Sequence, residues 1–431
     1  MLATTRKAII NTVSKATYAT AATTNAIQVS SASNGVKVAS SQEPGQTASL
    51  AVVVNGGTRV ESGKNVGVSH FLKNYGFRNS ANRTSFRVVR EAELAGGVLS
   101  ADLSRESLVY AAEFLKGDAE LFAEILSDVI TKQKYQEHEF IDVKSQTASE
   151  SVNAFANSEI SAFEAAHQLA FRTGLGNSVF AKASNQVSNA TVKAFAQQQF
   201  TQGNVALVGT GIEHEQLVNL AEQFLNLSTG SSGQLSGSQY FGGEARLEGH
   251  SNEYVLAFEG AAANSAEFAA LQVLRHALGG ELNIKHTVGS GLLAQAASKV
   301  NAHIKAFNIG YSDAGLFGVQ ISGAQTGVAV AAAAEQLKAA KNLSNEDFAR
   351  GVAQAKFAAT ASFETRLDRL QTLGAQAFRG SKYSAADAVA ALEKVSASDV
   401  AKVTEKLLKS KATVVALGDL YNLPYADSIS L

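Results

Sequence analysis

The stretch SLAVVVN, residues 49–55, is the clearest strand signal in the chain, because valines follow one another without a charge or a turn residue. A second run of this kind, EYVLAFE at residues 253–259, lies about 204 positions further on. Each run precedes a segment that predicts a helix, at residues 63–74 in the first case and 265–278 in the second. The chain therefore begins the same strand–helix arrangement twice.

Two further landmarks repeat in the same order, at distances of about 208 and 209 residues. The first is a strand before a helix: the strand lies at 108–114 in the first half, and at 316–321, before a helix at 326–341, in the second. The other is a helix before a strand. In the first half a helix at 191–200 precedes the strand NVALVG at 204–209, and in the second a helix at 398–408 precedes the strand ATVVALG at 412–418. Three landmarks at nearly constant distance indicate an internal duplication. We predict that residues 51–54 and 255–258 occupy equivalent places in two similar sheets.

The duplicated halves predict an α+β fold with two homologous domains, at residues 35–227 and 244–431. Between them, STGSSGQLSGSQYFGG at residues 228–243 is rich in glycine and serine and carries no charge, which is typical of a flexible linker. The turn EPGQ at residues 43–46 separates two strand runs and favours a hairpin. Each domain is therefore predicted to be a mostly antiparallel β-sheet with packed helices.

The composition excludes several kinds of function. The chain has 431 residues and no cysteine, which excludes disulfides, thiolate metal sites, iron–sulfur clusters and a cysteine nucleophile. Its formal net charge of −1 offers no electrostatic case for nucleic acid. No stretch approaches the roughly 20 apolar residues of a spanning helix. The chain is thus expected to reach any membrane through partners.

The first residues are typical of a mitochondrial address. No acidic residue precedes Glu43, while Arg6, Lys7 and Lys15 are basic and the region is rich in alanine, serine and threonine. An acid-poor, basic and amphipathic start is the pattern of a transit peptide. We predict one at residues 1–20, with an approximate end; the alternative is an ordinary flexible terminus.

The segment GVSHFLKNYGF, residues 67–77, holds the candidate chemistry. Positions 70, 73 and 74 share one helix face, where the pattern H-x-x-E-H would supply two zinc ligands and a general base. Here the three positions are His70, Lys73 and Asn74. A lysine cannot accept a proton at neutral pH, and asparagine is a poor zinc ligand. From these residues alone, we interpret His70 as a packed helix residue.

This segment resembles the inverted zinc motif of the pitrilysin/insulinase peptidases. The family places a glutamate ligand about 76 residues downstream, which corresponds to Glu150 in SQTASESVNAF, and a further acidic position corresponds to Val143. Residues 167–180 (HQLAFRTGLGNSVF) and 200–211 (FTQGNVALVGTG) are similar to later family segments. The resemblance runs from about residue 35 to the C-terminus, and implies the fold of the mitochondrial processing peptidases. With two zinc-helix positions lost, Glu150 is interpreted as a helix-surface carboxylate.

Family members that have a mitochondrial address but no catalytic site are of two kinds. One is the alpha subunit of the processing peptidase, which carries a long glycine-rich loop. The corresponding residues 279–299, GGELNIKHTVGSGLLAQAASK, lack a sustained glycine run. This favours the other kind, the core proteins of ubiquinol–cytochrome c reductase, respiratory complex III.

The resemblance therefore implies a non-catalytic core subunit that supports assembly of complex III. It implies no catalytic residue, no metal and no cofactor, with His70, Lys73, Asn74 and Glu150 as degenerate zinc-motif positions. The implied partners are core protein 1, cytochrome b and the c-type cytochrome and Rieske iron–sulfur subunits of a dimeric complex. The implied location is peripheral, on the matrix side of the mitochondrial inner membrane. Two alternatives stay open, the processing-peptidase alpha subunit and an active metallopeptidase with an unusual ligand set.

Overall fold

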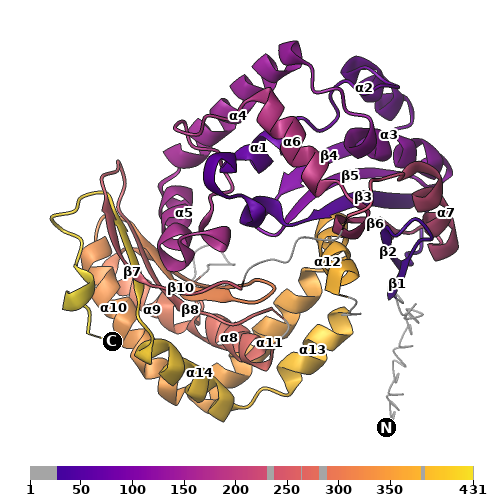
Figure 1. Cartoon of the computed structure of the whole chain (residues 1–431). Coiled ribbons are helices and arrows are strands. Elements are labelled where there is room, and N and C mark those ends of the chain that lie inside the picture. Colours follow the sequence, from indigo (N-terminus) through magenta and orange to yellow (C-terminus); the bar gives the residue numbers. More distant parts are fainter. Residues whose placement is uncertain (1–26, 231–236, 264, 281–288, 380–383, 431) are drawn as a thin grey trace, which may run out of the picture.

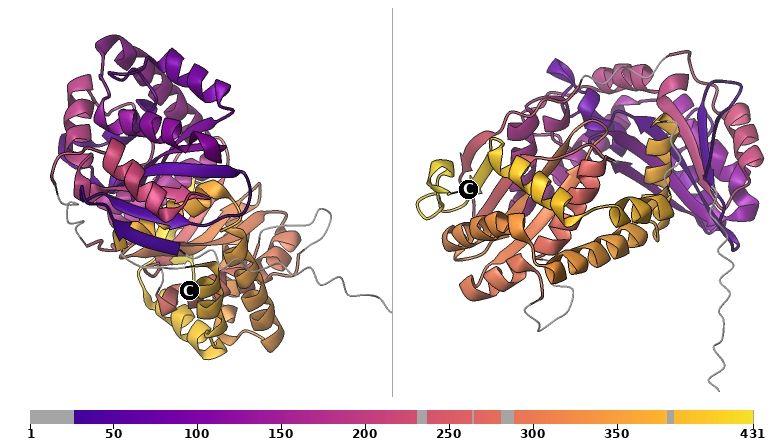
Figure 2. Two further views of the ribbon diagram at one scale, coloured as in Figure 1. Left: turned by 90° about the vertical axis from the view of Figure 1, so that its right-hand side faces the viewer. Right: turned by 90° about the horizontal axis from the view of Figure 1, so that it is seen from below.

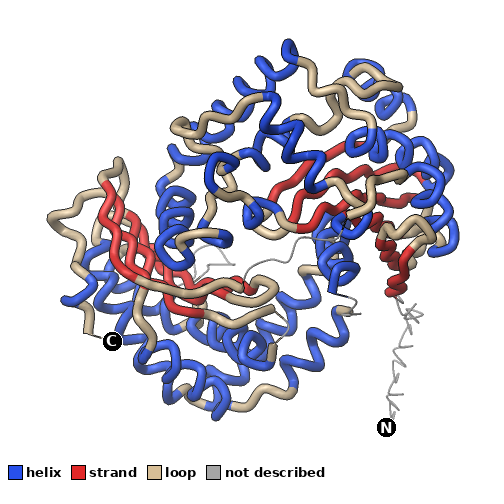
Figure 3. The backbone as a smooth tube through the Cα atoms, viewed as in Figure 1, coloured by secondary structure: helices blue, strands red, loops and turns tan. Residues whose placement is uncertain are grey.

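The computed structural model of the chain describes residues 27–230, 237–263, 265–280, 289–379 and 384–430. These residues form two lobes, each built on its own β-sheet (Figure 1). Figure 3 shows helices on the flanks of both sheets. The predicted transit peptide lies outside the described residues, as do parts of the predicted linker and of segment 279–299.

The first sheet has the strand order β1-β2-β6-β3-β5-β4. Its neighbouring strands are antiparallel except β2 and β6, which are parallel. The run SLAVVVN forms most of β3, in the middle of the sheet, where Val52 lies opposite Leu207 on one side and Tyr110 on the other. The strands are β1 (Ile27–Ser31), β2 (Lys37–Ser41), β3 (Thr47–Asn55), β4 (Val98–Leu103), β5 (Ser107–Leu115) and β6 (Val205–Thr210).

The hairpin predicted at residues 43–46 is wrong. This turn does connect β2 to β3, but β6 lies between the two strands and pairs with both. Every residue of β6 is buried, so its backbone N–H and C=O groups find hydrogen-bond partners only if a strand lies on each side of it. Because β6 is about 150 residues away in the sequence, the local turn pattern does not reveal it.

The second sheet repeats the first, with the order β7-β11-β8-β10-β9. β8 lies between β11 and β10 just as β3 lies between β6 and β5, and β7 is parallel to β11 as β2 is to β6. Residues 51–54 and 255–258 therefore occupy equivalent places, and the predicted duplication is confirmed. The strands are β7 (Gly243–Leu247), β8 (Glu253–Glu259), β9 (His303–Gly310), β10 (Gly315–Ser322) and β11 (Thr413–Leu417).

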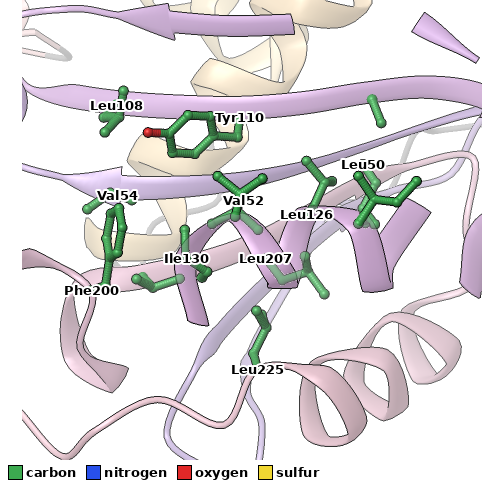
Figure 4. Packing of buried hydrophobic residues seen from close by; sticks show 14 of the residues in the cluster. Leu50, Val52, Val54, Leu108, Tyr110, Leu126, Ile130, Phe200, Leu207 and Leu225 are labelled. Carbon is green, nitrogen blue, oxygen red and sulfur yellow. The ribbon is translucent and has the colours of Figure 1, made fainter. Parts of the chain in front are cut away.

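The helices of the first half pack mainly on one face of the first sheet. The apolar stripe of α3, which includes Phe122, Ile125 and Leu126, is buried against β3 and β5. Figure 4 shows Leu126 beside Val52 and Leu207 in this core. The helices are α1 (Val68–Asn74), α2 (Ser85–Leu94), α3 (Ala119–Thr131), α4 (Glu137–Ala156), α5 (Ser158–Phe171), α6 (Asn189–Gln199) and α7 (His214–Phe224).

The helices of the second half follow the same plan on the second sheet. Two of them begin with a capping box, in which the side chain of Ser384 or Ser396 bonds to the amide of an aspartate three residues on. The helices are α8 (Ala266–Leu278), α9 (Leu292–Val300), α10 (Thr326–Ala339), α11 (Asn345–Ala361), α12 (Arg366–Arg379), α13 (Ala385–Glu393) and α14 (Ala397–Lys409).

In each half, one helix packs on the sheet of the other half. The alanines of α5, among them Ala162 and Ala166, are buried against β8 and β11 of the second sheet. Reciprocally, Leu370 and Leu373 of α12 are buried against the first sheet, on the face opposite α3. In the right-hand view of Figure 2 a yellow helical segment of the second half lies beside the strands of the first half. Full burial of each leucine contributes roughly 1.5–3 kcal/mol to the stability of this contact. The two lobes are therefore joined by buried apolar contacts on both sheets.

A buried arginine joins the lobes next to these helices. The guanidinium of Arg59 donates to Glu106 (2.6 Å), which belongs to its own half, and to Asp313 (2.6 Å) and Ser312 (2.9 Å) of the other half. Arg59 is 6% exposed, so this charge needs both carboxylates. Within the residues that the structure describes, no helix is both long and apolar enough to cross a membrane.

Candidate functional site

The helix α1 carries the degenerate motif, and a buried carboxylate fixes where it begins. Gly67 precedes the helix with φ of 90°, and a Cβ at this position would lie 2.4 Å from the amide of Asn185. Glu61 accepts hydrogen bonds from the backbone amides of Gly67 and Ser69, both at 2.7 Å. Burial raises the pKa of Glu61 to about 7, although both amides favour its ionised form. With its start fixed at Val68, the helix directs the side chain at position 70 into the interior of the first half.

His70 is buried and has a defined tautomer. Its Nδ1 accepts a hydrogen bond from the backbone amide of Ala181 at 3.1 Å. The ring proton must then sit on Nε2, which donates to Oε2 of Glu150 at 2.8 Å. Burial and the charge of Lys73 lower the pKa of His70, against the opposing effect of Glu150. The imidazole is thus neutral, and both of its nitrogens are engaged.

The other two motif positions also contact Glu150. The ammonium of Lys73 lies 2.8 Å from Oε2 of Glu150, and the amide of Asn74 donates to the same oxygen at 3.2 Å. Asn74 donates in addition to Thr147 at 2.9 Å, while Gln146 donates to Oε1 of Glu150 at 3.0 Å. The four motif positions predicted from the sequence are therefore in direct contact in the structure. We refer to His70, Lys73, Asn74 and Glu150 as the Glu150 cluster.

The electrostatics of the Glu150 cluster favour an ionised carboxylate. Burial opposes ionisation of Glu150, but hydrogen bonds from Lys73, Gln146, His70 and Asn74 outweigh it and lower its pKa to about 2. Three donors converge on the single oxygen Oε2. Glu150 and Lys73 form an ion pair whose side chains are 31% and 21% exposed.

The Glu150 cluster does not fit the zinc ion of an active family member. One imidazole donates its proton to the carboxylate, an ammonium occupies the space beside it, and an asparagine replaces the second imidazole. The side chain of Val143, at the position of the family's further acid, is fully buried in the apolar core. Among the described residues, no three histidine, cysteine, aspartate or glutamate side chains are grouped in a way that could hold a metal.

Sequence reasoning placed Glu150 on a helix surface and so missed its contacts. The side chain bonds to three residues of α1, and Thr147 and Gln146 of α4 complete the arrangement. The usable signal was the spacing of 146, 147 and 150 on one face of α4. His70 is packed as interpreted, against the ring of Phe180 with a centroid distance of 5.7 Å.

Comparison with known protein families matches both halves of the chain. Residues 37–183 match the family described as insulinase, peptidase family M16. Residues 186–355 match the family described as the peptidase M16 inactive domain. Together these matches include α1, α4 and the entire Glu150 cluster.

Several relatives of similar length are named cytochrome b-c1 complex subunit 2, and one is a processing-peptidase subunit. Cytochrome b-c1 complex subunit 2 of Cryptococcus neoformans is 39% identical over 402 residues, which cover 90% of this chain and 91% of the relative. Proteins of the same name from Neurospora crassa and Homo sapiens are 37% and 30% identical and cover 100% and 92% of this chain, and 97% and 90% of their own lengths. Mitochondrial-processing peptidase subunit alpha-2 of Dictyostelium discoideum is 30% identical and covers 94% of each chain.

Proposed function

The chain belongs to the insulinase family of peptidases, family M16, and from this premise we propose that it is a non-catalytic core subunit of the mitochondrial cytochrome b-c1 complex, of the core protein 2 type. The observation that carries the proposal is the extent of the likeness to subunit 2 proteins of fungi and mammals. At 30–39% identity it covers at least 90% of this chain and of each relative named above. Because the likeness extends along the full length, we infer that both lobes serve the role that they have in the subunit 2 proteins.

The Glu150 cluster supports a role without peptide hydrolysis. Hydrolysis by a zinc peptidase needs a metal-bound water and a general base. At the base position, Lys73 is an ammonium paired with Glu150, and it neither accepts a proton nor admits a dication. Coulomb repulsion between an ammonium and a zinc ion at this distance disfavours metal binding. The chain then contributes a folded body with surfaces for assembly.

In this role the chain docks with other subunits of the complex. We expect core protein 1, cytochrome b, the c-type cytochrome and the Rieske iron–sulfur protein as partners in a dimeric assembly. Electron transfer belongs to those partners, because this chain has no cysteine with which to hold a cluster. We expect peripheral attachment on the matrix side of the inner membrane; the basic, acid-free start of the sequence supports the mitochondrial location.

The test is deletion of the gene, with two activities measured on the same mitochondria. We expect antimycin-sensitive reduction of cytochrome c by ubiquinol to collapse because the complex fails to assemble. Cleavage of an imported precursor is expected to continue. Native electrophoresis of the deletion strain separates a failure of assembly from a failure of catalysis in an assembled complex.

A second candidate is the alpha subunit of the mitochondrial processing peptidase. The likeness to the Dictyostelium protein favours it, at 30% identity over 94% of both chains. Stalled precursor cleavage with intact reductase activity would select this candidate. An active metallopeptidase, the remaining alternative, would hold one tightly bound zinc per purified chain.

A further inference from the structure

Among the described residues, no strand pairs with the outer edge of β7, at the margin of the second sheet; the side chains of Glu244 and Arg246 contact the C-terminal segment at residues 420–426. Within the described residues, β7 pairs with β11 alone. The backbone amide of Gly243 donates to the carbonyl of Ala412 at 2.9 Å, which establishes which groups face β11. Because successive residues of a strand direct their N–H and C=O groups to opposite sides, those of Glu244 and Arg246 face outward. No hydrogen bond from another described residue reaches these backbone groups.

A groove of about 690 Å³ runs beside this edge, between α5 and β7. Its walls are largely apolar and include Ala165 and Leu169 of α5 and Ala245 and Leu247 of β7. Figure 1 shows α5 lying over the second sheet near β7. A strand added to the edge of β7 would direct every second side chain toward this groove.

Two cations from separate segments border the groove. Arg172 follows the end of α5, and Lys182 lies in the loop after residue 180; both side chains are exposed. One carboxylate, Glu164, also lines the groove. It is neutralised by the buried Arg105 at 2.7 Å and accepts a backbone amide at 3.2 Å. The field within the groove is therefore positive and favours an anionic side chain.

The backbone holds Arg172 in an unfavourable conformation. Its φ and ψ are 62° and −57°, and the amide of Thr173 donates to the carbonyl of Phe171 at 2.7 Å. This is a γ-turn with positive φ at a non-glycine residue, a strained arrangement that persists only where its surroundings impose it. The guanidinium lies over the ring of Phe241, 3.9 Å from its centroid. The fold thus presents this cation at the groove in a defined position.

We propose that an extended segment of another polypeptide, apolar and acidic, adds to β7 as a further strand. Its backbone pairs with Glu244 and Arg246, its apolar side chains enter the groove, and a carboxylate lies between Arg172 and Lys182. The inference goes beyond the function proposed above, because it requires only a partner with such a segment.

The chain's own N-terminal segment does not suit this place. It contains Arg6, Lys7 and Lys15 and no acidic residue, so its charge has the same sign as the groove. In addition, β1, to which it leads, lies in the first sheet on the other side of the molecule (Figure 1). Charge complementarity therefore selects a different, acidic chain.

The test uses the purified full chain and a heptapeptide that carries fluorescein on its N-terminal amine, fluoresceinyl-Thr-Val-Thr-Leu-Thr-Asp-Thr-amide. This probe places valine, leucine and aspartate on one face of a strand. We expect saturable binding by fluorescence anisotropy, and weaker binding, by at least about fivefold, when lysine replaces the aspartate. Hydrogen exchange should slow at the amides of Glu244 and Arg246. Of two probes N-methylated at odd or at even positions, one should lose binding and the other keep it, since only one edge of the peptide pairs.

The matched variants are Arg172→Gln with Lys182→Gln, and Lys144→Gln with Lys193→Gln as the control pair. Lys144 and Lys193 are exposed and lie away from the groove, so both variants lose two surface charges. We expect the first pair to weaken binding at least about fivefold and the control pair to leave it unchanged. Equal binding of the aspartate and lysine probes, absent protection at β7, or protection that grows with protein concentration alone would each overturn the proposal. The last result would identify a second copy of the chain as the occupant.

Discussion

The helix pair α1/α4 in the first half and the helix pair α8/α11 in the second half occupy equivalent places but are joined differently. Between α1 and α4 lies the Glu150 cluster, a polar set of side chains around one carboxylate. Between α8 and α11 the contact is close and is made by small residues, with one hydrogen bond from Arg350 to the carbonyl of Ala277 beside it: a Cβ on Gly351 would lie 3.0 Å from both Ala277 Cβ and the carbonyl of Val273. The fold therefore does not require a polar set here, because small residues in direct contact fill the same place.

This difference shows that the fold needs a contact between the two helices, whereas the polar Glu150 cluster is particular to the first half. If the Glu150 cluster is an altered metal site, two substitutions should restore it. If it is only a means of joining two helices, its removal should cost less than disturbing the close contact in the second half. Four measurements address these points.

The largest effect is expected from Lys73→Glu combined with Asn74→His. The double variant places a second imidazole beside His70 and removes the ammonium from Glu150, so three ligands surround one point. We expect one zinc per chain by metal analysis, with an affinity several orders of magnitude above that of the unaltered chain. Adding Glu150→Gln to the double variant removes the third ligand and should abolish tight binding. Equal zinc content in altered and unaltered chains would contradict this account of the cluster.

The next effect is expected from Gly351→Val. A valine side chain would overlap Ala277 and the backbone of α8, so the helices must separate. We expect a loss of about 1–3 kcal/mol in the free energy of unfolding, measured by urea denaturation. The matched control is Gly117→Val, since nothing lies within 4 Å of a Cβ at Gly117. A loss at Gly351 no larger than in the control would show that this helix contact is loose.

A smaller effect is expected from Glu150→Gln. The substitution keeps a side chain of similar shape but removes the charge that Lys73 contacts at 2.8 Å. Because both side chains are partly exposed, we expect a loss of about 1 kcal/mol. A double-mutant cycle with Lys73→Met isolates the pair, and a coupling of about 0.5–1 kcal/mol is expected. A coupling near zero would mean that the ammonium is held by something other than Glu150.

The smallest effect is the pH dependence of that loss. The pKa of Glu150 is about 2 in the folded chain against an ordinary value of 4.5, so the folded state binds fewer protons between these values. Its stabilisation is present above pH 4.5 and is lost as the pH falls toward 2. The difference in urea midpoint between the unaltered chain and Glu150→Gln should therefore shrink by about half between pH 6 and pH 3. A difference that grows on acidification would reverse the sign of the predicted linkage.

Much of the candidate site was accessible from the sequence, but its geometry was not. The helix predicted at residues 63–74, which runs from Val68 to Asn74 in the structure, and the loss of a base and a ligand at Lys73 and Asn74 are visible in the sequence itself. The position of Glu150 came from the spacing of a related family. That three donors converge on one of its oxygens could not be predicted, because α1 and α4 are brought together only by tertiary packing, α1 against the first sheet and α4 against α1 and α5.

The sequence by itself determined three strands of each sheet, the helices next to them and the repetition of this arrangement. SLAVVVN and EYVLAFE carry their strand preference locally, and a nearly constant distance between landmarks requires no structure to detect. Only the tertiary structure decided that β6 separates β2 from β3, and that α5 and α12 each cover the sheet of the opposite half. The physical reason is the range of the interaction. A strand's preference depends on its own residues. Its neighbour in the sheet, or the helix over its face, is selected by burial of apolar surface among segments far apart in the chain, about 80 residues for α5 and β8 and about 150 for β3 and β6.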